Sequence, residues 1–249
     1  MSLEIDFFLA LVVFLFGIGC FRYSKKLLIK AFDNRLSGSN LYVTQGFVTI
    51  FLEILFFMVV PLIFLSLRFD SLMKAMTIMG FNLSSLPWLL IGVICGVIFG
   101  VFDTKMTLRF GGGISNFTEE IGSWDKRQIR LYFFIFVFQS LLYSLPEEVL
   151  YRGFLQSQLN MLFGSISSLL LVTAVFSIHP HTKLRWSKSE LLRALPTAFI
   201  LCLLYFLSRS LMAPIISHWL TNFLSVFLIF KKKKDKNLIE QNRTKLVWV

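Results

Sequence analysis

The sequence predicts an all-α polytopic membrane protein, a helix bundle with about seven to eight transmembrane helices. Three observations predict this class. Of the 249 residues, 56% are hydrophobic and 29 are phenylalanine, and the mean hydropathy of +0.72 lies far above that of soluble proteins. Apolar runs of spanning or near-spanning length recur along the chain. The basic residues lie mainly in alternate loops between these runs.

Seven apolar runs account for the expected crossings, because each approaches the ~20 residues that a spanning helix needs. In chain order they are residues 5–21, 47–67, 86–102, 131–145, 166–178, 195–207 and 212–230. The first run is followed by basic residues within 22–26 and has none before it, which is typical of a spanning helix and not of a cleaved signal peptide. In the third run, Gly92, Gly96 and Gly100 repeat every fourth residue and predict close packing against a neighbouring helix.

The net charge of +11 indicates membrane orientation and not nucleic-acid binding, because the basic residues lie almost wholly in alternate loops. With the N-terminus outside, 21 of the 25 Lys and Arg residues face the cytoplasm. The C-terminus is then cytoplasmic, and the lysine run 231–234 is expected to anchor the last helix next to anionic lipid headgroups. The three cysteines are single residues inside apolar runs, so no disulfide or cysteine–metal framework is predicted.

The chain shows no soluble domain and no internal repeat, and we divide it into three parts. Residues 1–130 hold the N-terminal transmembrane helices and a polar cytoplasmic loop from 103 to 130, residues 131–230 form the core with the polar motifs, and residues 231–249 form a basic cytoplasmic tail. Glu53 lies alone in an apolar run and must be protonated, paired or facing water. A structural partner such as an arginine explains it at least as well as catalysis, and we assign it no catalytic role.

The most informative segment is 144–154, which places Glu147, Glu148 and Arg152 between apolar flanks. A lone charge at bilayer depth costs at least ~2.5 to 3.5 kcal/mol, so such a cluster indicates a functional site. A structural explanation also exists, because Ser144 and the following Pro–Glu form a helix-start signature with Ser144 as N-cap, and Glu148 can pair with Arg152 at i,i+4. Both explanations hold together if Glu148 and Arg152 are structural and Glu147 carries the chemistry.

All three histidines follow these glutamates in the chain. His218 and Asn222 are four residues apart in an apolar run, so a helix places both on one face at nearly the same depth. His179 closes the run 166–178, whereas His181 is expected in an interfacial loop. A single membrane histidine is most often a hydrogen-bonding residue between helices, but polar groups from three helices in a Phe- and Leu-rich background favour a shared site.

Glutamate and histidine with a water between them form a hydrolytic site that needs no serine or cysteine nucleophile. His218 and Asn222 would supply the hydrogen-bond donors that stabilise a tetrahedral oxyanion. The sequence has no H-E-x-x-H zinc signature, and the candidate ligands lie on separate helices. The cofactor question therefore stays open between a divalent metal such as zinc, with Glu147, His179 and His218 as candidate ligands, and no metal.

Two of these patterns resemble motifs of a known family. Glu147-Glu148-x-x-x-Arg152, followed by Gly-Phe-Leu, resembles the EExxxR first motif of the CAAX protease and bacteriocin-processing (CPBP, or Abi) membrane proteases. The third motif of that family is a histidine, three residues, and then an asparagine or aspartate. His218 and Asn222 match it.

The second family motif, a phenylalanine, three residues and a histidine, is matched less well. Phe176 stands only three positions before His179, so the phenylalanine position falls on Val175 if His179 is the true match. The alternative pairing through Ser177 and His181 is poorer.

The resemblance covers about residues 138–227 and implies a helical membrane bundle that cleaves peptides. In such a site the first glutamate and the second-motif histidine activate water, the third motif holds the oxyanion, and the remaining first-motif residues support the geometry. These roles fall on Glu147, His179, His218 and Asn222 for catalysis and on Glu148 and Arg152 for site support.

We therefore expect an intramembrane endopeptidase of a bacterial cell membrane that acts on a membrane-associated peptide or protein, in peptide maturation, signalling or bacteriocin immunity. The short chain without organelle signals favours a bacterial source, which makes a prenylated substrate a poor fit. A transporter would show paired halves, which this sequence lacks. The stronger rival is a non-catalytic scaffold that regulates a membrane partner such as a sensor kinase. The sequence leaves the substrate and the oligomeric state open.

Overall fold

The structure, a computed structural model, describes residues 3–33, 38–82, 86–110, 126–178 and 188–246. Within these ranges the chain forms helices and no strand. Two of the elements, η1 and η2, are π-helices. In chain order the elements are α1 (Leu3–Asp33), α2 (Gly38–Glu53), η1 (Ile54–Val59), α3 (Val60–Phe69), α4 (Leu72–Ile78), α5 (Leu86–Phe110), α7 (Lys126–Glu148), η2 (Val149–Gln156), α8 (Ser157–Phe163), α9 (Ser165–Ile178), α10 (Lys188–Ser208) and α11 (Met212–Leu246).

Six helical stretches in the described part of the chain are long and apolar enough to cross a membrane. They are Phe8–Ala31, Val43–Phe69, Leu86–Arg109, Ile129–Phe163, Leu191–Ser208 and Met212–Lys232. The run predicted at 166–178 forms the shorter apolar helix α9. All seven predicted runs are thus helical, and the prediction of an all-α, multi-pass membrane bundle is confirmed.

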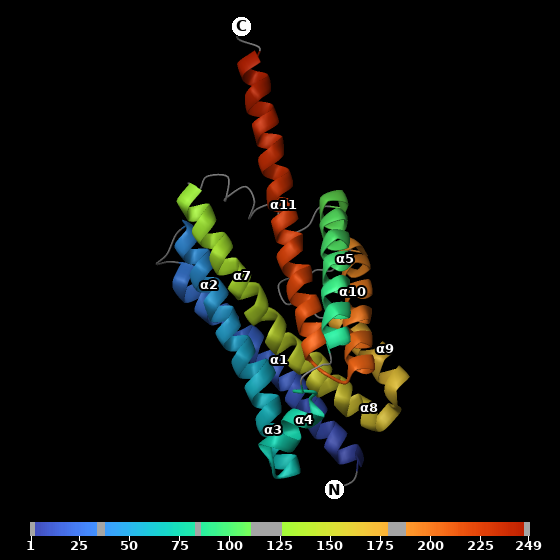
Figure 1. Ribbon diagram of the computed structural model, residues 1–249. Coiled ribbons are helices and arrows are strands. Elements are labelled where there is room, and N and C mark those ends of the chain that lie inside the picture. The colour runs from blue at the N-terminus through green and yellow to red at the C-terminus, as the bar shows by residue number, and fades with distance from the viewer. Residues whose placement is uncertain (1–2, 34–37, 83–85, 111–125, 179–187, 247–249) are drawn as a thin grey trace.

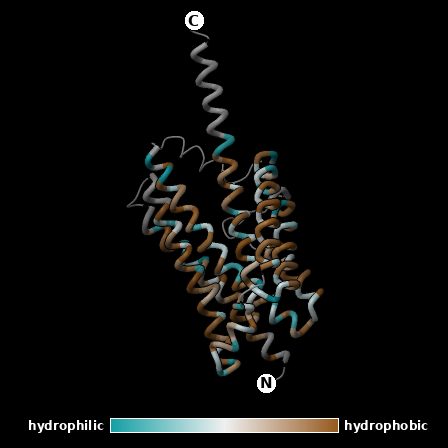
Figure 2. The backbone as a smooth tube through the Cα atoms, viewed as in Figure 1, coloured by the Kyte–Doolittle hydropathy of each residue, from teal (hydrophilic) through white to brown (hydrophobic). Residues whose placement is uncertain are grey.

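The helices lie in two groups (Figure 1). α1, α2, α3 and α7 lie on one side of the bundle, and α5, α10 and α11 lie on the other. α1 begins at one end of the bundle, and α11 continues beyond the opposite end. Figure 2 shows that apolar residues make up most of the bundle, with hydrophilic positions among them. Large apolar side chains such as Phe8, Leu67, Ile94 and Ile166 are exposed, as expected for surfaces that contact lipid.

The predicted N-cap at Ser144 is wrong, because α7 continues through this position to Glu148. The Ser144 hydroxyl donates to the carbonyl of Ser140 at 2.9 Å, one turn earlier in the same helix. Pro146 lies inside the helix, which membrane helices tolerate where neighbouring groups satisfy the backbone. The π-helix η2 begins just after Glu148. Both glutamates of the first motif therefore lie at the end of a long helix and not at the start of one.

η2 lies in the interior of the bundle, and all eight of its residues are buried. The ring of Tyr151 meets Phe14 of α1 edge-on, with centroids 5.8 Å apart. Phe154 meets Phe64 of α3 in the same way at 5.9 Å. Such edge-to-face contacts add to the area that the rings bury. They hold η2, and with it the first-motif side chains, against the N-terminal helices.

The glycine stripe of α5 packs against α11, as predicted. A Cβ atom at Gly92 would lie 2.7 Å from the carbonyl oxygen of Ala213, and one at Gly96 would lie 2.8 Å from that of Ser217. At Gly100 it would lie 2.8 Å from the Cβ of Leu224. Only glycine permits this approach, and a side chain at these positions would displace α11.

The polar loop predicted at 103–130 is wrong at both ends, because α5 extends to Phe110 and α7 begins at Lys126. Polar residues at the end of α5 are satisfied within the bundle. The Thr104 hydroxyl donates to the carbonyl of Gly100 at 2.7 Å, and Asp103 lies 3.2 Å from Arg193 of α10. A polar sequence was thus mistaken for a loop. Residues 111–125 lie outside the described ranges.

Candidate active site

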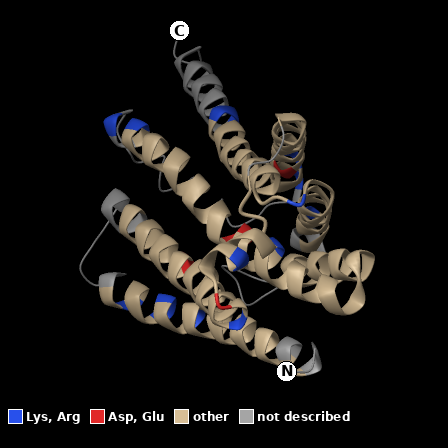
Figure 3. Cartoon of the chain, turned by 60° about the horizontal axis from the view of Figure 1, so that its bottom comes forward, with Lys and Arg blue, Asp and Glu red and all other residues tan. Residues whose placement is uncertain are grey.

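A cleft of about 480 Å³ is lined mainly by α7 and α11. Each helix contributes residues spaced three or four apart, which places them on one face. The α7 residues are Phe136, Ser140, Tyr143 and Glu147. The α11 residues are His218, Thr221, Asn222, Ser225 and Val226. Charged residues are sparse among the described helices of the bundle (Figure 3), so a cleft that contains several of them is set apart from the apolar background.

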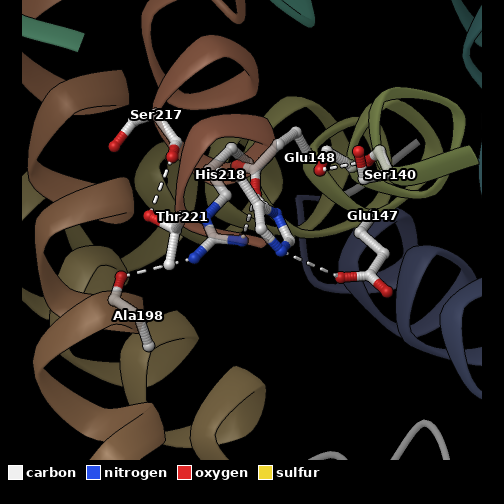
Figure 4. A network of polar contacts seen from close by, with 9 residues as sticks. Ser140, Glu147, Glu148, Ala198, Ser217, His218 and Thr221 are labelled. Carbon is white, nitrogen blue, oxygen red and sulfur yellow. Dashed lines mark hydrogen bonds and ion pairs between the residues drawn. The ribbon is translucent and has the colours of Figure 1, made fainter. Parts of the chain in front are cut away.

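The imidazole of His218 lies between the two glutamates of the first motif (Figure 4). Nδ1 is 2.7 Å from Oε1 of Glu148, which is hydrogen-bond distance. Nε2 is 3.7 Å from Oε2 of Glu147, which is longer than a hydrogen bond. His218 is 6% exposed and Glu147 8%, whereas Glu148 is fully buried. The adjacent glutamates are therefore not equivalent, because Glu148 fixes the ring and Glu147 lies beside its second nitrogen at the cleft.

Arg152 holds Glu148 in place. Its Nη1 donates to the same Oε1 at 3.0 Å, and both side chains are fully buried, as predicted from their i,i+4 spacing. Nη2 of Arg152 donates to the carbonyl of Ala198 in α10 at 3.3 Å. Oε2 of Glu148 has no hydrogen-bond partner among the described residues. The pair thus links the end of α7 and η2 to α10, and it presents one carboxylate oxygen to His218.

Phe176 of α9 packs over this pair and lines the cleft. The Arg152 guanidinium carbon lies 4.1 Å from the ring centroid, within the range of a cation–π contact. The same ring meets His218 edge-on at 6.0 Å and Tyr151 edge-on at 4.9 Å. In the sequence, Phe176 stood out only because it lies one position away from the phenylalanine position of the second motif. Its position beside a predicted site histidine was the available signal for a role in the site.

Asn222 lies one turn beyond His218 and lines the same cleft. The predicted common face of these two residues is therefore present. Thr221, which lies between them, donates its hydroxyl to the carbonyl of Ser217 at 2.8 Å.

His179 and His181 lie outside the described residues. The expectation that His179 meets Glu147, and the choice between His179 and His181 for the second motif, therefore remain predictions. α9 ends at Ile178, immediately before His179, with Phe176 already at the cleft.

Four further charged residues line the cleft, and three of them were not expected there from the sequence. Lys25 comes from α1, Glu53 from α2, Asp103 from α5 and Arg193 from α10. Nε of Arg193 lies 3.2 Å from Oδ1 of Asp103. Only Glu53 had stood out in the sequence, as a carboxylate in an apolar run, and among the described residues no arginine contacts it. The others look like ordinary flanking charges in the sequence.

No group of three or more His, Cys, Asp or Glu side chains is arranged to hold a metal ion among the residues that the structure describes. Of the three candidate ligands, Glu147 and His218 lie together, whereas His179 is outside those ranges.

One comparison with known proteins gives a family match. Residues 129–224 match the family model of the type II CAAX prenyl endopeptidases, Rce1-like. The match confirms the predicted family resemblance. The Rce1-like segment covers less than half of the chain, from α7 to the middle of α11, and contains every motif residue named above. No curated protein and no solved structure matches the chain. The family is one of proteases, so the match supports a membrane-embedded protease.

Proposed function

We propose that this protein is an intramembrane endopeptidase that hydrolyses a peptide bond of a membrane-associated peptide or protein. The observation that carries the proposal is the placement of His218, with Glu148 on Nδ1 at 2.7 Å and Glu147 beside Nε2 at 3.7 Å. This arrangement puts a carboxylate and an imidazole on one cleft at a separation too long for a direct hydrogen bond. A water on the cleft side can bridge the two groups by hydrogen-bonding to both.

In this proposal Glu147 is the general base. Its carboxylate takes a proton from a water, and the resulting nucleophile attacks the carbonyl carbon of the substrate. His179, the histidine of the second motif, is assigned as its partner in activating the water. The proton then passes to the leaving amine as the peptide bond breaks, so Glu147 acts first as a base and then as an acid.

His218 and Asn222 are assigned to the oxyanion. Glu148, as an ionised carboxylate, can only accept a hydrogen bond and therefore fixes a proton on Nδ1. When the ring is protonated, Nε2–H also becomes a donor, and the Asn222 amide one turn away supplies a second. Arg152 supports this arrangement by holding Glu148. Donors that are fixed before the reaction need no reorganisation as charge develops, which is why such contacts contribute strongly to catalysis.

The setting of the reaction belongs to the same proposal. Residues 131–230 form the catalytic core, with the N-terminus outside a bacterial cell membrane and the basic tail in the cytoplasm. Peptide maturation, peptide signalling and bacteriocin immunity are the roles that fit such an enzyme.

The orientation can be tested by cysteine labelling. In a cysteine-free background, a cysteine placed at Lys74 should react with an impermeant reagent on intact cells, and one placed at Lys188 should require permeabilised cells. The reverse labelling pattern would overturn the orientation.

The test of the activity is cleavage of a peptide library by the full chain in lipid nanodiscs, with products identified by mass spectrometry. Glu147→Gln keeps the shape of the side chain and removes the base, so cleavage should fall about 100-fold or more. Asp70→Asn is the matched control, since it makes the same change at an exposed left-handed C-cap position that asparagine tolerates. If Glu147→Gln cleaves as well as Asp70→Asn does, the mechanism is wrong. If the unmodified protein cleaves no peptide, the scaffold interpretation replaces it.

A further inference from the structure

One buried carboxylate in the cleft has no part in the proposed mechanism. Glu53, the last residue of α2, is 1% exposed and lines the cleft that also contains Glu147 and His218. Its Oε2 atom is buried and has no hydrogen-bond partner among the described residues. An acceptor in this state is costly unless some other molecule supplies a donor.

The nearest polar side chains on this wall use their protons elsewhere. The hydroxyl of Thr49, one turn before Glu53, donates to the carbonyl of Gln45 at 2.8 Å. The hydroxyl of Tyr143 on α7 donates to the carbonyl of Gly46 at 3.0 Å. Both residues line the cleft, yet each satisfies the backbone of α2 and not the carboxyl group. A ligand in the cleft is therefore the natural source of a donor for Glu53.

The charges of the cleft indicate which donor fits. Arg193 and Asp103 pair with each other at 3.2 Å. Among the described residues, two glutamates, Glu53 and Glu147, then line the cleft with the imidazole of His218 and one further cation, Lys25. The ammonium of Lys25 lies 5.4 Å from the ring centroid of Phe21. While His218 is neutral, one carboxylate is in excess, and a cationic group on the ligand would balance it.

Glu53 is also contributed by a part of the chain that the family match does not cover, since the Rce1-like segment begins at residue 129. The π-helix η1 starts at the next residue, Ile54. Short π-helical segments within α-helices are frequent at functional sites. The shared reaction would thus lie in the matched segment, and selection of the substrate would lie in the N-terminal helices.

We propose that Glu53 is a specificity-determining residue that binds a cationic group of the substrate. The group is a lysine or arginine side chain or a free peptide N-terminus, and its contact with Glu53 places the neighbouring peptide bond beside Glu147. This inference rests on the proposed function for its cleavage step and on the cleft alone for its binding step.

The cleavage test uses the full chain in nanodiscs with short apolar peptides that carry one lysine at each position in turn. Each lysine peptide is paired with its norleucine counterpart, and acetylated versions distinguish a side-chain amine from the N-terminus. We expect kcat/KM to be about tenfold or more higher for the best lysine or free-amine peptide. Glu53→Gln should abolish this preference and leave the norleucine peptide within about twofold. An unchanged preference in Glu53→Gln would overturn the proposal.

Lys25→Met is the matched control at the same cleft. If Glu53 binds the substrate, removal of the competing ammonium should preserve or increase the preference for cationic peptides. If Glu53 and Lys25 serve only as a structural pair, Lys25→Met and Glu53→Gln should lower membrane abundance alike without changing the preference, and the proposal fails.

A binding measurement separates this inference from the proposed function. Fluorescently labelled lysine and norleucine peptides are titrated into the Glu147→Gln protein and into Glu147→Gln/Glu53→Gln. We expect the lysine peptide to bind about tenfold more tightly to the first protein and equally to the second. If this difference is present while the unmodified protein cleaves nothing, the protease proposal fails and the subsite stands. Equal binding of the two peptides to Glu147→Gln refutes the subsite, whatever the cleavage result.

Discussion

Two segments of this chain repeat one local arrangement, and they differ in what surrounds it. α2 ends at Glu53 and passes into η1, and α7 ends at Glu148 and passes into η2. Both glutamates are almost fully buried. Arg152 and His218 contact Oε1 of Glu148, whereas no arginine or histidine contacts Glu53 among the described residues. Burial alone therefore does not assign a role, because the same placement yields an orienting group in one segment and a candidate ligand-binding group in the other.

The largest expected effect comes from removing Arg152, the ion-pair partner of Glu148. Arg152→Ala leaves Glu148 charged and fully buried, which should destabilise the protein by about 3 to 5 kcal/mol. Thermal unfolding in detergent and abundance in isolated membranes would both report the loss. Lys74→Ala, at an exposed position, is the control and should change neither quantity. A fully stable Arg152→Ala protein would mean that the pair does not stabilise the bundle.

Replacing both partners should separate stability from activity. In Glu148→Leu/Arg152→Met no buried charge is stranded, so stability should recover to within about 1 to 2 kcal/mol of the unmodified protein. Activity should stay at least about 100-fold lower, since the ring of His218 loses the acceptor that fixes Nδ1. Cleavage rates measured at equal amounts of folded protein would test this. Recovery of both stability and activity would show that Glu148 has only a structural role.

A third substitution displaces α11, the helix that carries His218. Gly96→Leu places side-chain atoms where a Cβ would already lie 2.8 Å from the carbonyl oxygen of Ser217, so α11 must move. We expect a destabilisation of about 1 to 3 kcal/mol and a loss of cleavage larger than the loss of folded protein. Gly19→Leu is the control, since nothing lies within 4 Å of a Cβ at that position. Equal behaviour of the two variants would refute close α5–α11 packing.

The smallest effect is expected at Glu53, which no described arginine or histidine contacts. Glu53→Gln keeps the size and the acceptor of the side chain and removes a charge that no described arginine or histidine contacts. The free energy of unfolding should therefore change by less than about 1 kcal/mol, in either direction. Unfolding measured beside Arg152→Ala gives the comparison directly. A destabilisation as large as that of Arg152→Ala would mean that Glu53 has a structural partner after all.

Much of this architecture could be predicted from the sequence because the bilayer imposes it. Apolar runs, glycine spacing and the Glu148–Arg152 spacing each reflect a local constraint, and each has its counterpart in the structure. The start of a helix at Ser144 was wrongly predicted, since the soluble-protein capping signature does not break a helix that neighbouring helices support. The joining of Lys25, Glu53, Asp103 and Arg193 into one cleft could not be predicted, because packing between distant helices has no local sequence signal.

The glycine contact between α5 and α11 links the candidate active site to the lipid around it. α5 is the least buried of the six spanning stretches, with 17% of its apolar window inside the bundle, so lipid determines much of its environment. A hydrophobic helix responds to a thinner or thicker bilayer by changing its tilt. Because the backbones of α5 and α11 meet without intervening side chains, a change in the tilt of α5 is passed directly to the helix that carries His218 and Asn222. The acyl-chain length of the surrounding lipid is thus expected to regulate the proposed peptide cleavage.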